Sequence, residues 1–171
     1  KKSRAEMRRP QAARLLADGA YKFDAPRAKR PPARGASAIA LVIASESTAE
    51  LESAIKAGVA VAEGMALTKD LGNLGGNVCT PAYMAETAQK LGKEFGFDVE
   101  ILERADMEKL GMHSALSVGR ASYSPCKFIV MKYSKGGSAK PIVLIGKGMT
   151  FDTGGVSLKP GANLDEMKYD M

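Results

Sequence analysis

Short apolar runs alternate along this chain with longer stretches of helical periodicity, and few folds accommodate such an alternation. Four runs have the length and composition of buried strands: 38–44, 99–102, 128–131 and 142–145. The spacing of apolar residues predicts helices over 9–20, from Ser47 towards Leu71, from Thr80-Pro81 onward, and over Ala105–Leu110. Strands that alternate with helices favour an α/β fold built in layers.

Local signals mark where several of these elements begin and end. Ser47 and Glu50 have the spacing of a capping box, which predicts that a helix starts there. Thr80 followed by Pro81 is typical of a helix N-cap with proline in the first turn. Gly136-Gly137 predicts a turn between the runs 128–131 and 142–145, which we therefore expect to be neighbouring buried strands.

The histidine and cysteine counts exclude several kinds of site. His113 is the only histidine in the 171 residues, so neither a His-rich zinc site nor an HExxH motif can be built. A Ser-His-Asp triad would depend on His113, which has no supporting motif around it. The only two cysteines, Cys79 and Cys126, lie far apart in the sequence. A reducing cytoplasm is therefore expected, and a disulfide scaffold is not.

The overall composition is that of a soluble globular protein, but its basic residues are unevenly distributed. Hydrophobic residues make up 45% of the chain, and no apolar run is long enough to span a bilayer. No apolar stretch follows the basic start, so no signal peptide is expected. Residues 1–34 hold 11 Lys or Arg and 3 Asp or Glu. A contact with nucleic acid is one interpretation of this basic arm; a solvated segment or linker is the one we favour.

Charged residues and glycines gather after the last apolar run. Loops that follow strands are where ligands usually bind in open α/β sheets. Asp152 and Asp170 offer hard oxygen ligands for divalent cations, and Lys159 could neutralise an oxyanion. Lys147 lies between two glycines, but neither the P-loop nor the dinucleotide-binding glycine pattern is matched. From these residues alone, a metal site is one interpretation and a solvated acidic loop is the other.

The string GKGMTFDTGGVSLKPGANLDEMKYDM, residues 146–171, resembles the signature region of the leucyl aminopeptidase (cytosol aminopeptidase) family of two-metal exopeptidases. Four further segments also fit that family: LLADGAYKFD (15–24), DLGN (70–73), NVCTP (77–81) and VGR (118–120). The resemblance covers residues 11–171. It implies an α/β fold in which 37–171 form the first part of a mixed-sheet catalytic domain of the zinc-exopeptidase type. Residues 1–36 would then be an inter-domain linker helix and basic loop.

The resemblance also implies a role for each matching residue. Two divalent ions (zinc, manganese or magnesium) would lie side by side and share a water. Lys147 and Asp170 would bind one ion, and Asp152 would bridge both. Lys159 would be the catalytic residue that holds the scissile carbonyl oxygen, and Met167 would line the pocket for the substrate's first side chain. All five residues would thus face the bound peptide.

A reaction and an assembly follow from the same resemblance. The family releases N-terminal amino acids, with leucine and other bulky apolar residues preferred, in the cytoplasm and as a homo-hexamer. Some bacterial members also bind DNA as accessory or repressor proteins, which is the alternative function for the basic arm. The family's sites also use a downstream Asp-x-Glu-x-Arg segment, whose Arg holds a bicarbonate. The segment is not among the 171 residues, so we expect this stretch alone to be inactive and poorly soluble.

Overall fold

The computed structural model describes residues 4–25, 38–40 and 48–170, apart from the side chains of 4–9 and 170. It divides into two compact units, Lys1–Leu74 and Gly75–Met171, and each is described here by itself. The predicted division of the chain at residue 36 falls within a stretch outside the described residues. That division therefore stays a prediction.

The first unit is a pair of packed helices, α1 (Arg4–Gly19) and α2 (Ala49–Asn73). The helices lie close together at Gly58, where an added Cβ would lie 2.2 Å from the backbone oxygen of Pro10 and 3.0 Å from the Ala13 Cβ. Glycine at this position therefore allows the two helices to touch. A polar contact adds to the packing, since the Tyr21 hydroxyl donates to Asp70 Oδ1 at 2.7 Å.

Both helices of this unit begin at residues other than those predicted. Helix α1 starts before residue 9 and contains Pro10 in its interior. Helix α2 is capped by Thr48, whose hydroxyl accepts a hydrogen bond from the Leu51 amide at 3.2 Å. The prediction of Ser47 as the cap was therefore wrong by one residue. Thr48 lies three residues before Leu51, which is the spacing at which an N-cap hydroxyl accepts from a backbone amide of the first helical turn.

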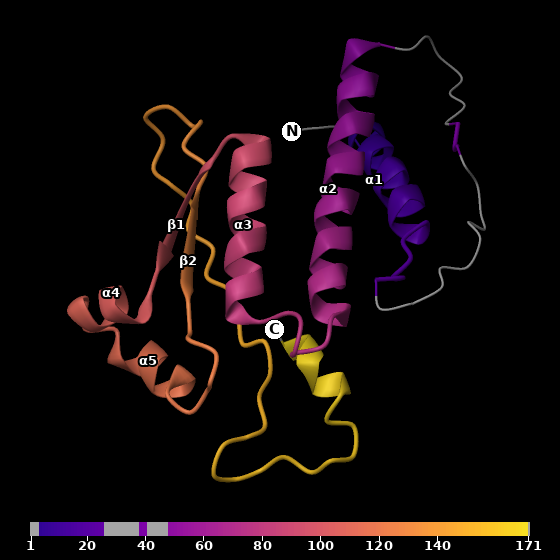
Figure 1. Ribbon diagram of the computed structural model, residues 1–171. Coiled ribbons are helices and arrows are strands. Elements are labelled where there is room, and N and C mark those ends of the chain that lie inside the picture. Colours follow the sequence, from indigo (N-terminus) through magenta and orange to yellow (C-terminus); the bar gives the residue numbers. More distant parts are fainter. Residues whose placement is uncertain (1–3, 26–37, 41–47, 171) are drawn as a thin grey trace. The chain divides into compact units, whose positions relative to one another are not determined.

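The second unit contains a helix, a two-stranded sheet and two short helices inserted between the strands (Figure 1). Helix α3 (Pro81–Phe95) packs on strands β1 (Asp98–Leu102) and β2 (Phe128–Lys132), which pair antiparallel. Helices α4 (Arg104–Lys109) and α5 (His113–Gly119) connect the two strands, and the 3-10 helix η1 (Glu166–Asp170) follows the last long loop. Helix and sheet lie close together at Gly92, where an added Cβ would lie 2.7 Å from Val99 Cγ2.

The apolar run 142–145 is not a buried strand in this structure, contrary to the prediction. Ile142, Leu144 and Ile145 are 91–92% exposed and Val143 is 73% exposed, and all four lie in irregular structure. A strand needs a neighbour to which its backbone can bond. Among the described residues, β1 and β2 pair only with each other. Of the predicted strand 38–44, residues 38–40 are irregular and 41–44 lie outside the described residues.

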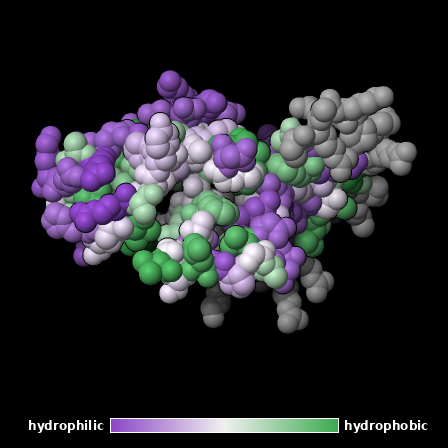
Figure 2. Space-filling model, turned by 60° about the horizontal axis from the view of Figure 1, so that its bottom comes forward, coloured by the Kyte–Doolittle hydropathy of each residue, from purple (hydrophilic) through white to green (hydrophobic). Residues whose placement is uncertain are grey.

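In the part of the chain that the structure describes, helices are combined with a small antiparallel sheet. A larger mixed sheet of the zinc-exopeptidase type stays a prediction. The core is small, with seven buried apolar residues among those described, of which Met107 and Cys79 are the most enclosed. Many apolar side chains therefore reach the surface, and Figure 2 shows some of them among polar groups on one face. No described helix is both long and apolar enough to cross a membrane.

Candidate active site

The loop that carries the predicted site residues is held to the start of α3 through Phe151. A Cβ added to Gly76 would lie 3.0 Å from the Phe151 Cβ and 3.4 Å from its ring. Gly76 precedes the Thr80 cap of α3, whose hydroxyl accepts from the Tyr83 amide. The absence of a side chain at Gly76 thus leaves room for the aromatic ring. This contact holds Phe151, the residue before Asp152, against the segment that leads into α3.

A tight turn follows, and it is organised by the carboxylate of Asp152. The Gly154 amide donates to Asp152 Oδ1 at 2.8 Å, which is the two-residue spacing of an Asx turn. Gly154 has a φ of 94°, which favours glycine. The turn then returns on itself, because the Lys159 amide donates to the Thr153 carbonyl at 2.8 Å. The backbone therefore brings residues 152 and 159 together.

Within this turn, the side chains of Asp152 and Lys159 form an ion pair. Lys159 Nζ lies 3.4 Å from Asp152 Oδ2, and the two side chains are 25% and 39% exposed. The Gly154 amide lowers the pKa of the Asp152 carboxyl below its ordinary value, and the positive charges of Lys159 and Lys147 lower it further. Hydrogen bonds to a carboxylate and nearby cations both favour its ionised form. Asp152 is thus a carboxylate at neutral pH, with one oxygen directed at a cation.

The structure brings some of the predicted site residues together and not others. Asp152 and Lys159 are in contact, and Lys147 is close enough for its charge to act on Asp152, although its own side chain is exposed. Met167 is half-buried in η1. The backbone of Asp170 ends η1, while its side chain lies outside the described residues. Among the residues described, no three His, Cys, Asp or Glu side chains group closely enough to hold a metal.

Two backbone groups contribute to this arrangement and were not identified from the sequence. The Gly154 amide binds the carboxylate of Asp152, and the Thr153 carbonyl binds the backbone of Lys159. A sequence signal exists for the first, because an aspartate two residues before a glycine is typical of an Asx turn. No local signal exists for the second, since it joins residues six apart through an irregular loop.

The sequence was compared with known families, and the match includes this loop. A profile described as "Cytosol aminopeptidase family, catalytic domain" matches residues 66–171. A probable cytosol aminopeptidase of Azoarcus sp. strain BH72 is 67% identical over 165 residues, covering 94% of this chain and 33% of the relative. One from Aromatoleum aromaticum is 58% identical over 167 residues, with the same two coverages.

The structure resembles several solved structures, and one of them is an enzyme in complex with a metal. The bottromycin maturation enzyme BotP in complex with Mn matches with a TM-score of 0.70 and 32% identity, over 92% of this chain and 32% of that one. The chain thus spans about one third of the length of the relatives it matches. Because the profile covers the loop of Asp152 and Lys159 and the identity to the named relatives is high, this chain belongs to the cytosol aminopeptidase family.

Proposed function

We propose that this chain is part of a metal-dependent aminopeptidase, which releases N-terminal amino acids from peptides and prefers leucine or other bulky apolar residues. The observation that carries the proposal is the Asp152–Lys159 pair within the segment that matches the family's catalytic domain. Membership of the family makes peptides the expected substrates. The basic arm gains no support as a nucleic-acid site from these relatives, and we do not propose that role.

The donor chemistry at Asp152 fits a divalent ion. Its carboxylate is held ionised by the Gly154 amide, and Oδ2 already faces a cationic group. Asp152, Asp170 and Lys147 are the residues that would hold the metal, with Lys147 binding through its amine nitrogen. BotP, a similar structure, has been solved with Mn, and manganese, zinc and magnesium are the ions we consider. When bound, such ions supply a water that is acidic enough to act as a nucleophile at neutral pH.

Lys159 has a different role in this proposal. It is only partly exposed, and its amine lies beside the carboxylate that would bind metal. A substrate carbonyl near the metal would therefore lie within reach of this amine. An ammonium in that position stabilises the negative charge that develops on the carbonyl oxygen during hydrolysis. Met167, half-buried and one helical turn before Asp170, is the residue we assign to the pocket for the first side chain of the substrate.

Several properties of the whole protein are proposed on the same basis. The chain spans about a third of its relatives, so the complete site needs residues beyond these 171. We infer that an Asp-x-Glu-x-Arg segment completes the metal ligands and binds bicarbonate, and that the whole protein is a cytoplasmic homo-hexamer. The stretch 1–171 alone is then inactive, and the exposed run 142–145 makes it poorly soluble.

The test is hydrolysis of leucine para-nitroanilide by the full-length enzyme that contains residues 1–171. The rate is measured with manganese, after treatment with a chelator, and after manganese is restored. We expect turnover that the chelator abolishes and added metal recovers. The matched control is N-acetyl-leucine para-nitroanilide, whose blocked amine an aminopeptidase does not accept. Equal rates on the two substrates, or full activity after exhaustive chelation, would contradict the proposal.

A further inference from the structure

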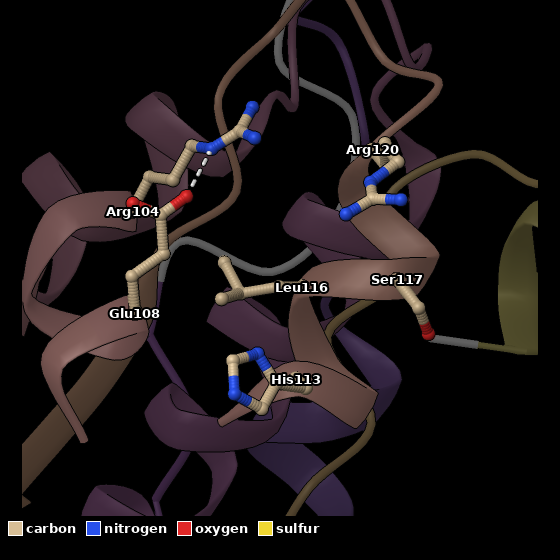
Figure 3. A pocket seen from close by; sticks show the side chains of 6 residues that line it. All are labelled: Arg104, Glu108, His113, Leu116, Ser117 and Arg120. Atoms are coloured by element: carbon tan, nitrogen blue, oxygen red, sulfur yellow. Dashed lines mark hydrogen bonds and ion pairs between the residues drawn. The ribbon is translucent and has the colours of Figure 1, made fainter. Parts of the chain in front are cut away.

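The space between α4 and α5 forms a hollow of about 500 Å³ that is separate from the loop of Asp152 and Lys159. We call it the α4–α5 hollow; its lining residues are Arg104, Glu108, His113, Leu116, Ser117 and Arg120. Figure 3 shows Arg104 and Glu108 of α4 on one side and Arg120, at the end of α5, on the other. The side chains of Leu116 and His113 lie between them (Figure 3).

The charges around this hollow are mostly positive, and several donors are available. Arg104 Nε donates to Glu108 Oε1 at 2.9 Å, and this ion pair is exposed. Three groups make no hydrogen bond or ion pair with the described residues. They are the terminal amino groups of Arg104, the guanidinium of Arg120 and the imidazole of His113. Ser117 is engaged, since its hydroxyl donates to the Ser114 carbonyl at 2.7 Å. Two guanidinium groups and one imidazole thus line the hollow against a single carboxylate.

We propose that the α4–α5 hollow binds a phosphate group, held between Arg104 and Arg120. The planar fork of a guanidinium matches two oxygens of a phosphate, and two arginines can hold different oxygens of one tetrahedral anion. The ion pair with Glu108 fixes the Arg104 side chain and leaves its terminal N–H groups free to donate. Ordering of that side chain before binding reduces the entropy lost when the anion is bound.

Glu108 makes the hollow selective among anions. A hydrogen phosphate carries a P–OH donor as well as acceptor oxygens, so it can bind both guanidiniums and also donate to the Glu108 carboxylate. Sulfate is of similar shape and is fully deprotonated at neutral pH, so it has no proton to donate and only repels that carboxylate. A contact between like charges is unfavourable. The hollow should therefore prefer phosphate to sulfate.

The experiment is isothermal titration calorimetry of the full-length enzyme at a fixed ionic strength. The ligands are inorganic phosphate, sulfate and glycerol 2-phosphate, each titrated separately. We expect binding of phosphate and weaker binding of sulfate. Arg120→Gln should weaken phosphate binding roughly tenfold or more, because a charge-assisted hydrogen-bonded pair is lost. Lys109→Gln is the matched control: it removes one positive charge from α4 at a residue that does not line the hollow. That variant should bind phosphate as the unaltered protein does.

A second variant tests the role of Glu108. Glu108→Gln removes the negative charge and supplies an amide donor, so it should strengthen sulfate binding and narrow the preference for phosphate. The phosphate group could belong to a phosphorylated small molecule or to the free ion, and glycerol 2-phosphate distinguishes the two. Tighter binding than that of inorganic phosphate would indicate a phosphorylated small molecule, and weaker binding would indicate the free ion. The proposal is overturned if the unaltered protein binds no phosphate, or if Arg120→Gln and Lys109→Gln weaken binding equally. Failure here leaves the aminopeptidase proposal intact, since none of the residues proposed to hold the metal or the substrate lines the hollow.

Discussion

Gly154 determines how the two charged side chains of the candidate site meet. Its amide bonds to Asp152, and its backbone has the positive φ that allows the chain to return to Lys159. An added Cβ would lie 2.4 Å from the Ser157 carbonyl oxygen and 2.9 Å from the Lys159 amide nitrogen. These atoms belong to the backbone, so they cannot move aside as a flexible side chain would.

We therefore predict that Gly154→Ala lowers kcat/KM on leucine para-nitroanilide by at least roughly tenfold, because displacement of the turn moves Lys159 from its position near the reacting group. Gly155→Ala is the matched control. Gly155 also has a positive φ, of 76°, but a Cβ there would meet nothing within 4 Å. That variant should bear only the backbone strain of about 1–2 kcal/mol and keep most of its activity. Equal activities in the two variants would show that the turn does not position Lys159.

Among the elements, helix α3 connects the loop to the fold, and its start depends on one hydroxyl. The Thr80 side chain accepts from the Tyr83 amide at 3.3 Å. Thr80→Ala should destabilise the first turn by about 1 kcal/mol. Amide hydrogen exchange in residues 81–88, measured by mass spectrometry, should then be roughly fivefold faster.

Thr87→Ala is the control for this prediction, since it makes the same change within the same helix. The Thr87 hydroxyl only donates back to the Tyr83 carbonyl, a contact that gives a helix little stability. Exchange in the first turn should therefore remain as in the unaltered protein. Unchanged exchange in Thr80→Ala would show that Pro81 and the packing of α3 are sufficient to start the helix.

The elements predicted correctly from the sequence are those with local signals. The Thr80-Pro81 cap is confirmed. The predicted strands 99–102 and 128–131 and the predicted helix 105–110 are also confirmed, each with bounds that differ by no more than one residue at either end. The run 142–145 was predicted wrongly, because its composition favours a strand but a strand also needs a partner. Helix α5 was missed, since Met112, which precedes it, makes no side-chain cap bond. Neither a missing strand partner nor a helix start without a side-chain cap leaves a local signal in the sequence.

In the candidate site, too, the features without a local sequence signal could not be predicted. Asp152 and Lys159 were assigned through the resemblance to a family, and the structure shows them 3.4 Å apart. Spacing alone could not predict this contact, because residues 153–158 form an irregular loop whose path depends on glycines. The lowered pKa of the Asp152 carboxyl was also beyond the sequence, since its largest cause is the hydrogen bond from the Gly154 amide. The roles of Lys147, Asp170 and Met167 stay predictions.

In the whole molecule, we propose that the active site is shared between this chain and further residues of a longer enzyme. The chain spans about one third of its relatives, and it exposes the four apolar residues from Ile142 to Ile145 directly before the site loop. An exposed apolar stretch of this kind marks a surface that is normally covered. Metal binding and catalysis must therefore be measured on the full-length enzyme and not on residues 1–171 alone.

In the proposed active site, Asp152 holds metal while Lys159 acts on the substrate. The most direct test of these two roles is to measure bound metal by atomic absorption, together with kcat on leucine para-nitroanilide, in three variants of the full-length enzyme. We predict that Asp152→Asn loses both metal and activity. Lys159→Met should keep its metal and lose kcat by roughly 10²–10³-fold, the cost of one donor to the developing oxyanion. Glu166→Gln, which changes an exposed neighbour in the same motif, should alter neither. Full metal content and full kcat in Asp152→Asn, or loss of metal from Lys159→Met, would contradict the account.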